Sequence, residues 1–244
     1  MVKPLIIAHR GAMGTAPENT AASFRKAMDE GADGIELDVH MTKDGHLVVI
    51  HDERVDRTSN GKGFVKDMTL NELKEFDFGS YYDAAYAGER ILTLEEALEI
   101  IQKCPLINIE IKNGPIFYEG IEEKVLDVIR EFGIASRVVI SSFNHYTIHK
   151  ISQLYPEISC GLLYMEGLFR PWEYARTVGA QALHPYYLSV TPDEIRRCRE
   201  NGLKVNVFGA NDDYFINALI RAGADGIITD YPARALEIRK STAG

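Results

Sequence analysis

Cysteine is scarce in this sequence. The chain of 244 residues contains 3 cysteines, Cys104, Cys160 and Cys198, and they lie far apart. So small and scattered a set excludes a disulfide framework and a cysteine-rich zinc site. We therefore expect buried, reduced thiols and a cytoplasmic location.

Long apolar runs are missing as well. No segment approaches the roughly 18 consecutive apolar residues that a membrane span needs. Near the N-terminus, the apolar run 5–8 ends at His9 and Arg10, and it is shorter than the ~7–15-residue core of a secretory signal. The sequence thus predicts neither stable membrane insertion nor secretion.

The chain has no surplus of positive charge. It contains 27 lysines and arginines against 36 aspartates and glutamates, which gives a formal net charge of −9. This balance argues against nucleic acid as the main partner, because binding to a phosphate backbone needs a surplus of Lys and Arg. A small phosphate ester is still compatible with the charge, provided that a local group of cations or a metal ion offsets the surrounding carboxylates.

The apolar residues that are present form eight short runs, which alternate with amphipathic helical patterns. In the first such pattern, Phe24, Ala27 and Met28 recur at helical spacing, and Gly31 follows at the position of a C-terminal cap. This alternation predicts an α/β fold with a parallel sheet, and eight units favour a closed (β/α)8 barrel, a TIM barrel, over an open sheet. The expected strands are 5–8, 34–39, 106–111, 138–143, 160–164, 182–186, 205–208 and 226–229.

Residues 47–51 form a further strand-like run that does not fit the alternation. Too few residues precede it for a crossover helix, and an Asp-Gly dipeptide at 44–45 is a strong signal for a two-residue hairpin turn. With such a turn, Asp38 lies directly opposite His51, and directly opposite residues share a face. We therefore predict an antiparallel return strand that brings His51 beside Asp38 and leaves the barrel with eight strands.

The polar and aromatic segment 52–90 follows this hairpin and is predicted to form a small insertion above the barrel. Capping-box patterns at 69–72 and 93–96 predict a short helix within it and the barrel helix after it. The segment is either a substrate lid or a packed excursion without substrate contact. In both cases we expect residues 1–244 to form a single catalytic domain.

Carboxylates gather at the predicted strand ends. Residues two apart in a strand face the same way, so Glu36 points with Asp38, and Glu110 points with Lys112 on the neighbouring strand. Three clustered carboxylates raise one another's pKa unless a counter-charge is present, and a hard cation with oxygen ligands, Mg²⁺ or Ca²⁺, supplies it better than zinc. The alternative is a set of salt bridges to Arg10 and Lys112. We expect Glu36, Asp38 and Glu110 to bind the metal.

Two histidines, His9 and His51, are predicted to flank these carboxylates. Histidine titrates near neutrality, so one of the pair can accept a proton while the other donates one. Arg10 and Lys112 are suited to phosphate oxygens. The set therefore predicts metal-assisted cleavage of a phosphate ester. Structural or surface roles are expected for the other candidates, which are His40, His46, His145, His149, His184 and Asp230.

Short motifs run in order along nearly the whole chain. They are HRG at 9–11, PENT at 17–20, ELDV at 36–39, TKDG at 42–45, HD at 51–52, IEIK at 109–112, SF at 142–143 and DGIITDYP at 225–232. Together they resemble the glycerophosphodiester phosphodiesterase family. The resemblance implies a barrel of the phosphodiesterase type with an insertion after strand two. It also implies hydrolysis of a glycerophosphodiester to glycerol 3-phosphate and an alcohol.

The resemblance also implies roles for individual residues. His9 and His51 become the acid–base pair, with His9 as base and His51 as acid, while Arg10 and Lys112 contact phosphate and the three carboxylates hold the metal. Many members have tryptophan where this chain has Phe208, which is therefore expected to line the substrate pocket. Either the 2-hydroxyl of glycerol or water is the first nucleophile.

Two other functions compete with this prediction. A lysophospholipase D-like phosphodiesterase needs a wider apolar mouth, which the aromatic residues of 52–90 could supply. A catalytically silent phosphate-binding barrel is disfavoured, because both histidines and all three carboxylates are present. The preferred alcohol, the choice between Mg²⁺ and Ca²⁺ and the oligomeric state stay open at this level.

Overall fold

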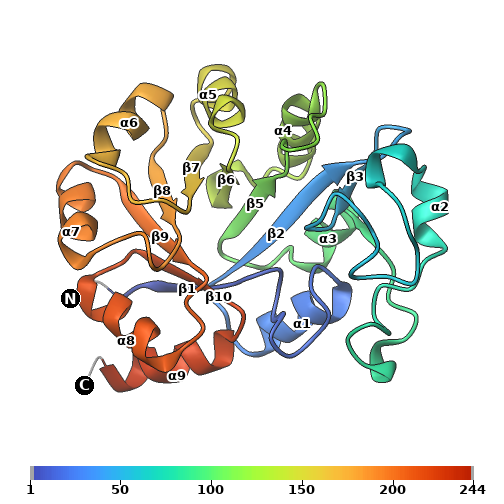
Figure 1. Ribbon diagram of the computed structural model, residues 1–244, viewed down its shortest axis with the longest axis horizontal. Helices are drawn as coiled ribbons and strands as arrows, with labels where there is room; N and C mark the ends of the chain where they lie inside the picture. Colours follow the sequence, from blue (N-terminus) through green and yellow to red (C-terminus); the bar gives the residue numbers. More distant parts are fainter. Residues whose placement is uncertain (1–2, 243–244) are drawn as a thin grey trace.

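The computed structural model describes residues 3–242, in which eight parallel strands form a closed barrel (Figure 1). Closure occurs at β1, which pairs in parallel with both β2 and β10. The predicted TIM barrel is therefore confirmed. Its strands are β1 (Leu5–Ala8), β2 (Gly34–Met41), β5 (Ile107–Ile111), β6 (Val138–Ser142), β7 (Ser159–Tyr164), β8 (Ala182–Pro185), β9 (Lys204–Phe208) and β10 (Gly226–Thr229).

Helices surround the barrel (Figure 1), and their apolar side chains belong to the same buried core as those of the strands. Phe24, Leu98 and Val125 are examples of helix residues that join the strands in one continuous core. None of the helices within 3–242 is long and apolar enough to cross a bilayer. They are α1 (Ala21–Asp29), α3 (Leu94–Ile100), α4 (Ile121–Glu131), α5 (His145–Leu154), α6 (Pro171–Val178), α7 (Pro192–Glu200), α8 (Asp213–Ala222) and α9 (Pro232–Thr242).

The expected hairpin is present, with β3 (Leu47–Val49) antiparallel to β2. Its predicted register is wrong by one residue. The backbone N–H of Ile50 donates to the carbonyl oxygen of Asp38 at 3.1 Å, so Ile50 and not His51 lies opposite Asp38. His51 follows the end of β3 in a bend.

The register error comes from the length of the turn. The backbone N–H of Thr42 donates to the carbonyl oxygen of His46 at 2.9 Å, which leaves three residues in the loop instead of two. Gly45 is the third of them and has a φ of 83°, in the left-handed region that glycine adopts at low cost. The extra loop residue shifts every later residue of the return strand by one position.

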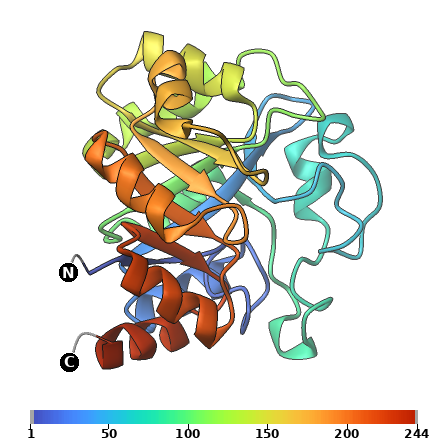
Figure 2. The same cartoon turned by 60° about the vertical axis from the view of Figure 1, so that its left-hand side comes forward.

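Residues 52–90 stand beside the barrel and connect β3 to the short strand β4 (Leu92–Thr93) (Figure 2). Both predicted capping boxes are formed, at the starts of α2 (Leu70–Lys74) and α3. The segment is not a loose loop, because it shares a small apolar cluster with the hairpin. The buried members of that cluster are Val48, Ile50, Val55, Val65, Leu73, Phe78 and Ile91.

Three tyrosines attach this segment to the loop between β1 and α1. The hydroxyl groups of Tyr81, Tyr82 and Tyr86 form hydrogen bonds of 3.0–3.2 Å to the backbone of residues 14–18. The hydroxyl of Tyr81 accepts, and the other two donate. These hydroxyls thus hold the segment in place.

Candidate active site

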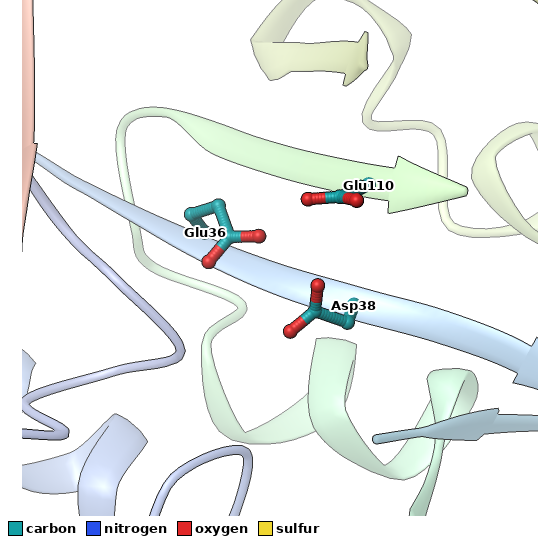
Figure 3. A group of neighbouring side chains, drawn as sticks. All are labelled: Glu36, Asp38 and Glu110. Atoms are coloured by element: carbon teal, nitrogen blue, oxygen red, sulfur yellow. The ribbon is translucent and has the colours of Figure 1, made fainter. Parts of the chain in front are cut away.

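Three carboxylates converge from the middle of β2 and the C-terminal end of β5 (Figure 3). Glu36 and Asp38 project from β2, and Glu110 projects from β5, where it is the registered partner of Asp38. One oxygen atom of each residue lies within 4.8 Å of the others, and all three side chains are buried. The convergence predicted from strand periodicity is therefore present in the structure.

The pKa values of the two carboxyl groups on β2 are shifted in opposite directions. Burial, together with the nearby charges of Asp38 and Glu110, raises the pKa of Glu36 well above its usual value. Burial also acts to raise the pKa of Asp38, but the charges of Lys112 and Arg10 outweigh it and hold that pKa below its usual range. Asp38 is thus a fixed anion, whereas Glu36 needs a further positive charge to ionise easily.

Two cations already touch this cluster. The Lys112 Nζ atom lies 2.6 Å from an oxygen of Glu110 and 3.5 Å from Asp38 Oδ1. The Arg10 Nε atom lies 3.3 Å from Asp38 Oδ2, and the backbone N–H of Arg10 donates to Glu36 at 2.9 Å. The salt bridges of the alternative explanation are therefore present, but they do not supply a hydrogen bond to every carboxylate oxygen of the cluster.

Two buried oxygen atoms, Glu36 Oε1 and Asp38 Oδ1, have no hydrogen-bond partner among the described residues. A buried acceptor without a partner is uncommon and calls for a ligand at that place. Carboxylate oxygens in such a group form a hard donor set that suits Mg²⁺ or Ca²⁺. The residues present therefore fit a divalent cation.

His9 is oriented by a carboxylate on the neighbouring strand end. Its Nδ1 atom lies 2.7 Å from Asp230 Oδ1, while Asp230 Oδ2 accepts a hydrogen bond of 2.6 Å from Asn211. Burial acts to raise the pKa of Asp230, but the hydrogen bond and charge of His9, together with Arg10 and Asn211, outweigh it and keep that pKa below its usual value. The sequence predicts only a structural role for Asp230 and does not reveal this pair, although β10 lies beside β1.

His51 has a carboxylate partner of its own. Its Nδ1 atom lies 2.6 Å from Asp52 Oδ1, and Asp52 Oδ2 accepts a hydrogen bond of 2.7 Å from Arg57. The bond to His51 is the largest of the effects that hold the pKa of Asp52 below its usual value. In both histidines one ring nitrogen is thus occupied by a carboxylate, which orients the ring and leaves Nε2 for a substrate.

The backbone of His51 is also fixed, through His40 on β2. The Nε2 atom of His40 lies 3.0 Å from the carbonyl oxygen of His51, and its Nδ1 atom lies 2.9 Å from the hydroxyl of Tyr118. Burial lowers the pKa of His40 to about 4, so the ring is neutral at pH 7 and donates to His51 while it accepts from Tyr118. The structural role predicted for His40 is confirmed.

Substitution Tyr118→Phe is expected to weaken this support. It leaves the buried Nδ1 atom of His40 without a partner, which lowers the free energy of unfolding by about 1–3 kcal/mol. Because His51 loses part of its support, kcat falls more than KM rises. Urea unfolding and steady-state kinetics measure the two effects, with Tyr214→Phe on an exposed part of α8 as the control. Unchanged stability would contradict this role of the Tyr118 hydroxyl.

Residues of the PENT motif link the two halves of the site. Glu18 accepts a hydrogen bond of 2.8 Å from Arg10 and a second one of 2.6 Å from Arg57. Asn19 donates to Asp38 at 2.9 Å from a backbone with a φ of 57°. The motif thus holds Arg10 and Asp38 in position, a role that residue chemistry alone did not predict.

These groups surround one cavity of about 200 Å³. One wall is polar and includes both histidines, whereas the opposite wall is apolar and includes Phe208. The ring of Phe208 lies 6.0 Å from Phe143 and 5.5 Å from Tyr186, centroid to centroid. The residues that line the cavity are His9, Arg10, Glu36, His51, Asn108, Glu110, Phe143, Leu163, Met165, Phe208 and Ile228.

Comparison with known proteins assigns the chain to one family. The family model described as the glycerophosphoryl diester phosphodiesterase family matches residues 9–234. The chain belongs to this family. A glycerophosphodiester phosphodiesterase of Caldanaerobacter subterraneus is 50% identical over 238 residues, which cover 97% of this chain and 98% of that one. A Bacillus subtilis protein of the same name is 35% identical over 257 residues, which cover 97% of this chain and 86% of that one.

Solved structures agree with this assignment. An Oleispira antarctica phosphodiesterase in complex with the product sn-glycerol-3-phosphate has a TM-score of 0.90 and 31% identity, covering 97% of both chains. A glycerophosphodiester phosphodiesterase from Agrobacterium tumefaciens has a TM-score of 0.83 and 30% identity, covering 97% of this chain and 100% of that one. The predicted family, fold and enzyme class are confirmed.

Phe208 of this phosphodiesterase is expected to contribute to binding and not to the chemical step. Its ring offers an apolar face to the cavity and no group that can exchange a proton. Phe208→Ala should therefore raise KM or change the preference among diesters, and alter kcat less. Steady-state kinetics on several diesters test this. A collapse of kcat at constant KM for every substrate would argue against it.

Proposed function

We propose that this protein hydrolyses glycerophosphodiesters to glycerol 3-phosphate and an alcohol in a metal-dependent reaction. The observation that carries the proposal is the set of three buried carboxylates, two of whose oxygens accept no hydrogen bond from the described residues, beside a cavity lined by two histidines that each have a carboxylate partner. The product bound to the Oleispira antarctica structure supports the glycerol phosphate half of the substrate.

Glu36, Asp38 and Glu110 are the residues that would hold the metal, either Mg²⁺ or Ca²⁺. When bound, such an ion stabilises the negative charge that develops on the phosphoryl oxygens. Arg10 and Lys112 lie beside the carboxylates and would contact the phosphate. The ammonium group of Lys112 forms an ion pair with Glu110. Once a metal ion neutralises the carboxylates, this ammonium group can bind a phosphate oxygen instead.

His9 and His51 divide the proton transfers. In this assignment His9 Nε2 accepts the proton of the nucleophile, and His51 Nε2 delivers a proton to the leaving alkoxide. Asp230 and Asp52 keep each ring in the required orientation through Nδ1 and stabilise its protonated form. Both water and the 2-hydroxyl of glycerol are nucleophiles compatible with this arrangement.

The organisation of the chain forms part of the proposal. Residues 1–244 act as one catalytic domain, and residues 52–90 are an insertion that contributes Arg57 to the support of His51. We propose a cytoplasmic location, because the three cysteines are all buried and none of them forms a disulfide. Its partner is the small diester itself.

The proposed activity can be tested by following glycerol 3-phosphate released from a panel of glycerophosphodiesters. The expected result is turnover with Mg²⁺ or Ca²⁺ and none after exhaustive chelation. The panel contains glycerophosphocholine, glycerophosphoethanolamine and glycerophosphoglycerol, which identifies the preferred alcohol. Binding of glycerol 3-phosphate without turnover of any diester would instead favour the silent phosphate-binding barrel.

A further inference from the structure

One arginine of the insertion bridges two carboxylates beside the catalytic cavity. The guanidinium group of Arg57 donates to both oxygens of Asp52, at 2.7 and 3.0 Å, and to both oxygens of Glu18, at 2.6 and 2.8 Å. Its planar fork is the side-chain group whose geometry suits two bidentate carboxylate contacts. The Arg57 side chain is nevertheless 47% exposed, at a position where a simple ion pair contributes little to stability.

The contacts of Arg57 join the two ends of the site. At one end, Oδ1 of Asp52 is shared between Arg57 and Nδ1 of His51, which lies 2.6 Å away. At the other end, Oε1 of Glu18 is shared between Arg57 and Arg10, each of which donates at 2.8 Å. The series of hydrogen bonds therefore runs without interruption from the proposed proton donor to the proposed phosphate contact.

Neither carboxylate has another side-chain partner within residues 3–242. The side chain of Asp52 contacts His51 and Arg57, and the side chain of Glu18 contacts Arg10 and Arg57. Burial acts to raise the pKa of Glu18, but the hydrogen bond from Arg57 and the charges of both arginines outweigh it and hold that pKa below its usual value. Glu18 is thus a buried anion that depends on both cations.

The bridging residues can act on a substrate only through their neighbours. The described residues that line the catalytic cavity include Arg10 and His51 but not Glu18, Asp52 or Arg57. His51 follows β3 in a bend and does not belong to a strand. The orientation of its ring therefore depends on side-chain contacts, and a carboxylate that is itself fixed gives a better defined contact than a mobile one.

We propose that Glu18 and Arg57 are positioning residues that tie the proton donor His51 to the phosphate-binding Arg10. The proposal rests on the proposed function, in which His51 protonates the leaving alkoxide. Arg57 fixes Asp52, and Asp52 in turn aims Nε2 of His51 at the leaving oxygen. Because Glu18 holds both arginines, a phosphate bound by Arg10 lies in a fixed relation to the donor. The insertion is therefore required for proton delivery.

Arg57→Gln tests the link to the leaving group, because it leaves the contact between Glu18 and Arg10 in place. On glycerophosphocholine we expect kcat to fall by about 10–100-fold, a part of the about 10²–10⁴-fold that general acid catalysis contributes, while KM changes little. An activated aryl diester, whose leaving group departs without a proton, should restore nearly full activity. An equal loss on both substrates would overturn the proposal.

Two further variants separate charge from geometry. Glu18→Gln loosens Arg10 as well as Arg57, so KM should rise and kcat should fall on glycerophosphocholine, and the aryl diester should rescue kcat but not KM. Arg57→Lys keeps the charge but cannot form two bidentate contacts, so it should recover only a minor part of the activity that Arg57→Gln loses. Full activity of Arg57→Lys would show that charge alone suffices and would contradict a positioning role.

Arg54→Gln is the matched control for these variants. Arg54 belongs to the same insertion, its side chain is 42% exposed, and it forms an ion pair of 3.0 Å with Asp56. Its loss should leave kcat and KM unchanged on both substrates, because exposed ion pairs contribute little. A loss in Arg54→Gln equal to that in Arg57→Gln would assign the effect to the stability of the insertion and refute the proposal.

A crystal structure of Arg57→Gln tests the bridge without turnover. We expect the Asp52 side chain to leave His51 or to occupy several conformers, whereas His9 and its partner Asp230, which Arg57 does not contact, stay in place. An unchanged contact of 2.6 Å between Asp52 and His51 would overturn the proposal.

The outcomes also separate this proposal from the function on which it rests. If the unmodified enzyme hydrolyses glycerophosphocholine but Arg57→Gln loses no activity, the positioning role fails alone. If no diester is hydrolysed in the presence of metal, the proposed function fails, and the crystal structure of Arg57→Gln then decides the positioning role by itself.

Discussion

His51→Ala is expected to lower kcat on glycerophosphocholine by about 10²–10⁴-fold, and His9→Ala by a similar factor. Choline leaves as an alkoxide that needs a proton, and the nucleophile has a proton to lose. One histidine cannot hold both roles in the same step. The two side chains lie on the same cavity, and each has a carboxylate on Nδ1, so neither can replace the other without rearrangement.

An activated aryl analogue of the same diester distinguishes the two roles. An aryl alkoxide departs without a proton, so this substrate should restore the activity of His51→Ala and not that of His9→Ala. Rescue of His9→Ala alone would reverse the assignment of acid and base. Activity near that of the unmodified enzyme in either variant, on the natural diester, would remove that histidine from the mechanism.

Loss of a carboxylate from the cluster is expected to have the second large effect. Glu110→Gln removes a charged oxygen donor but keeps the shape of the side chain. Residues that only orient a metal ligand contribute about 10–100-fold to metal affinity, so loss of the ligand itself should cost more than about 100-fold. Metal titration by calorimetry gives the affinity, and diester turnover at saturating Mg²⁺ gives the remaining activity.

The same measurements need a control for general charge effects. Asp127→Asn removes a carboxylate from an exposed ion pair with Arg130 on α4. Asp127 does not belong to the carboxylate cluster. It should leave metal affinity and turnover unchanged, because exposed ion pairs contribute little. Full activity of Glu110→Gln after exhaustive chelation would refute the metal assignment.

Much of this site could be predicted from the sequence because barrel geometry is regular. Once strand ends are located, residues two apart on one strand must share a face, and neighbouring strands must end at the same side of the barrel. These two regularities alone predict that Glu36, Asp38 and Glu110 lie together, and the structure places them within one group. The starts of α2 and α3 could also be predicted, because a capping box depends on only four consecutive residues.

Other features could not be predicted because they depend on contacts without a periodic pattern. Arg57 reaches Glu18 across 39 residues of sequence, and Asp230 reaches His9 across 221. The hairpin register depended on whether Gly45 ends a two-residue or a three-residue turn, which an Asp-Gly pair alone does not decide.

The most direct measurement of the central claim is a crystal structure with Mn²⁺ and glycerol 3-phosphate, read by anomalous scattering. We expect one strong anomalous peak within about 2.0–2.6 Å of oxygens from Glu36, Asp38 and Glu110, next to a phosphate contacted by Arg10 and Lys112. An ordered phosphate in the cavity without any peak at the three carboxylates, or a peak at another site, would contradict it.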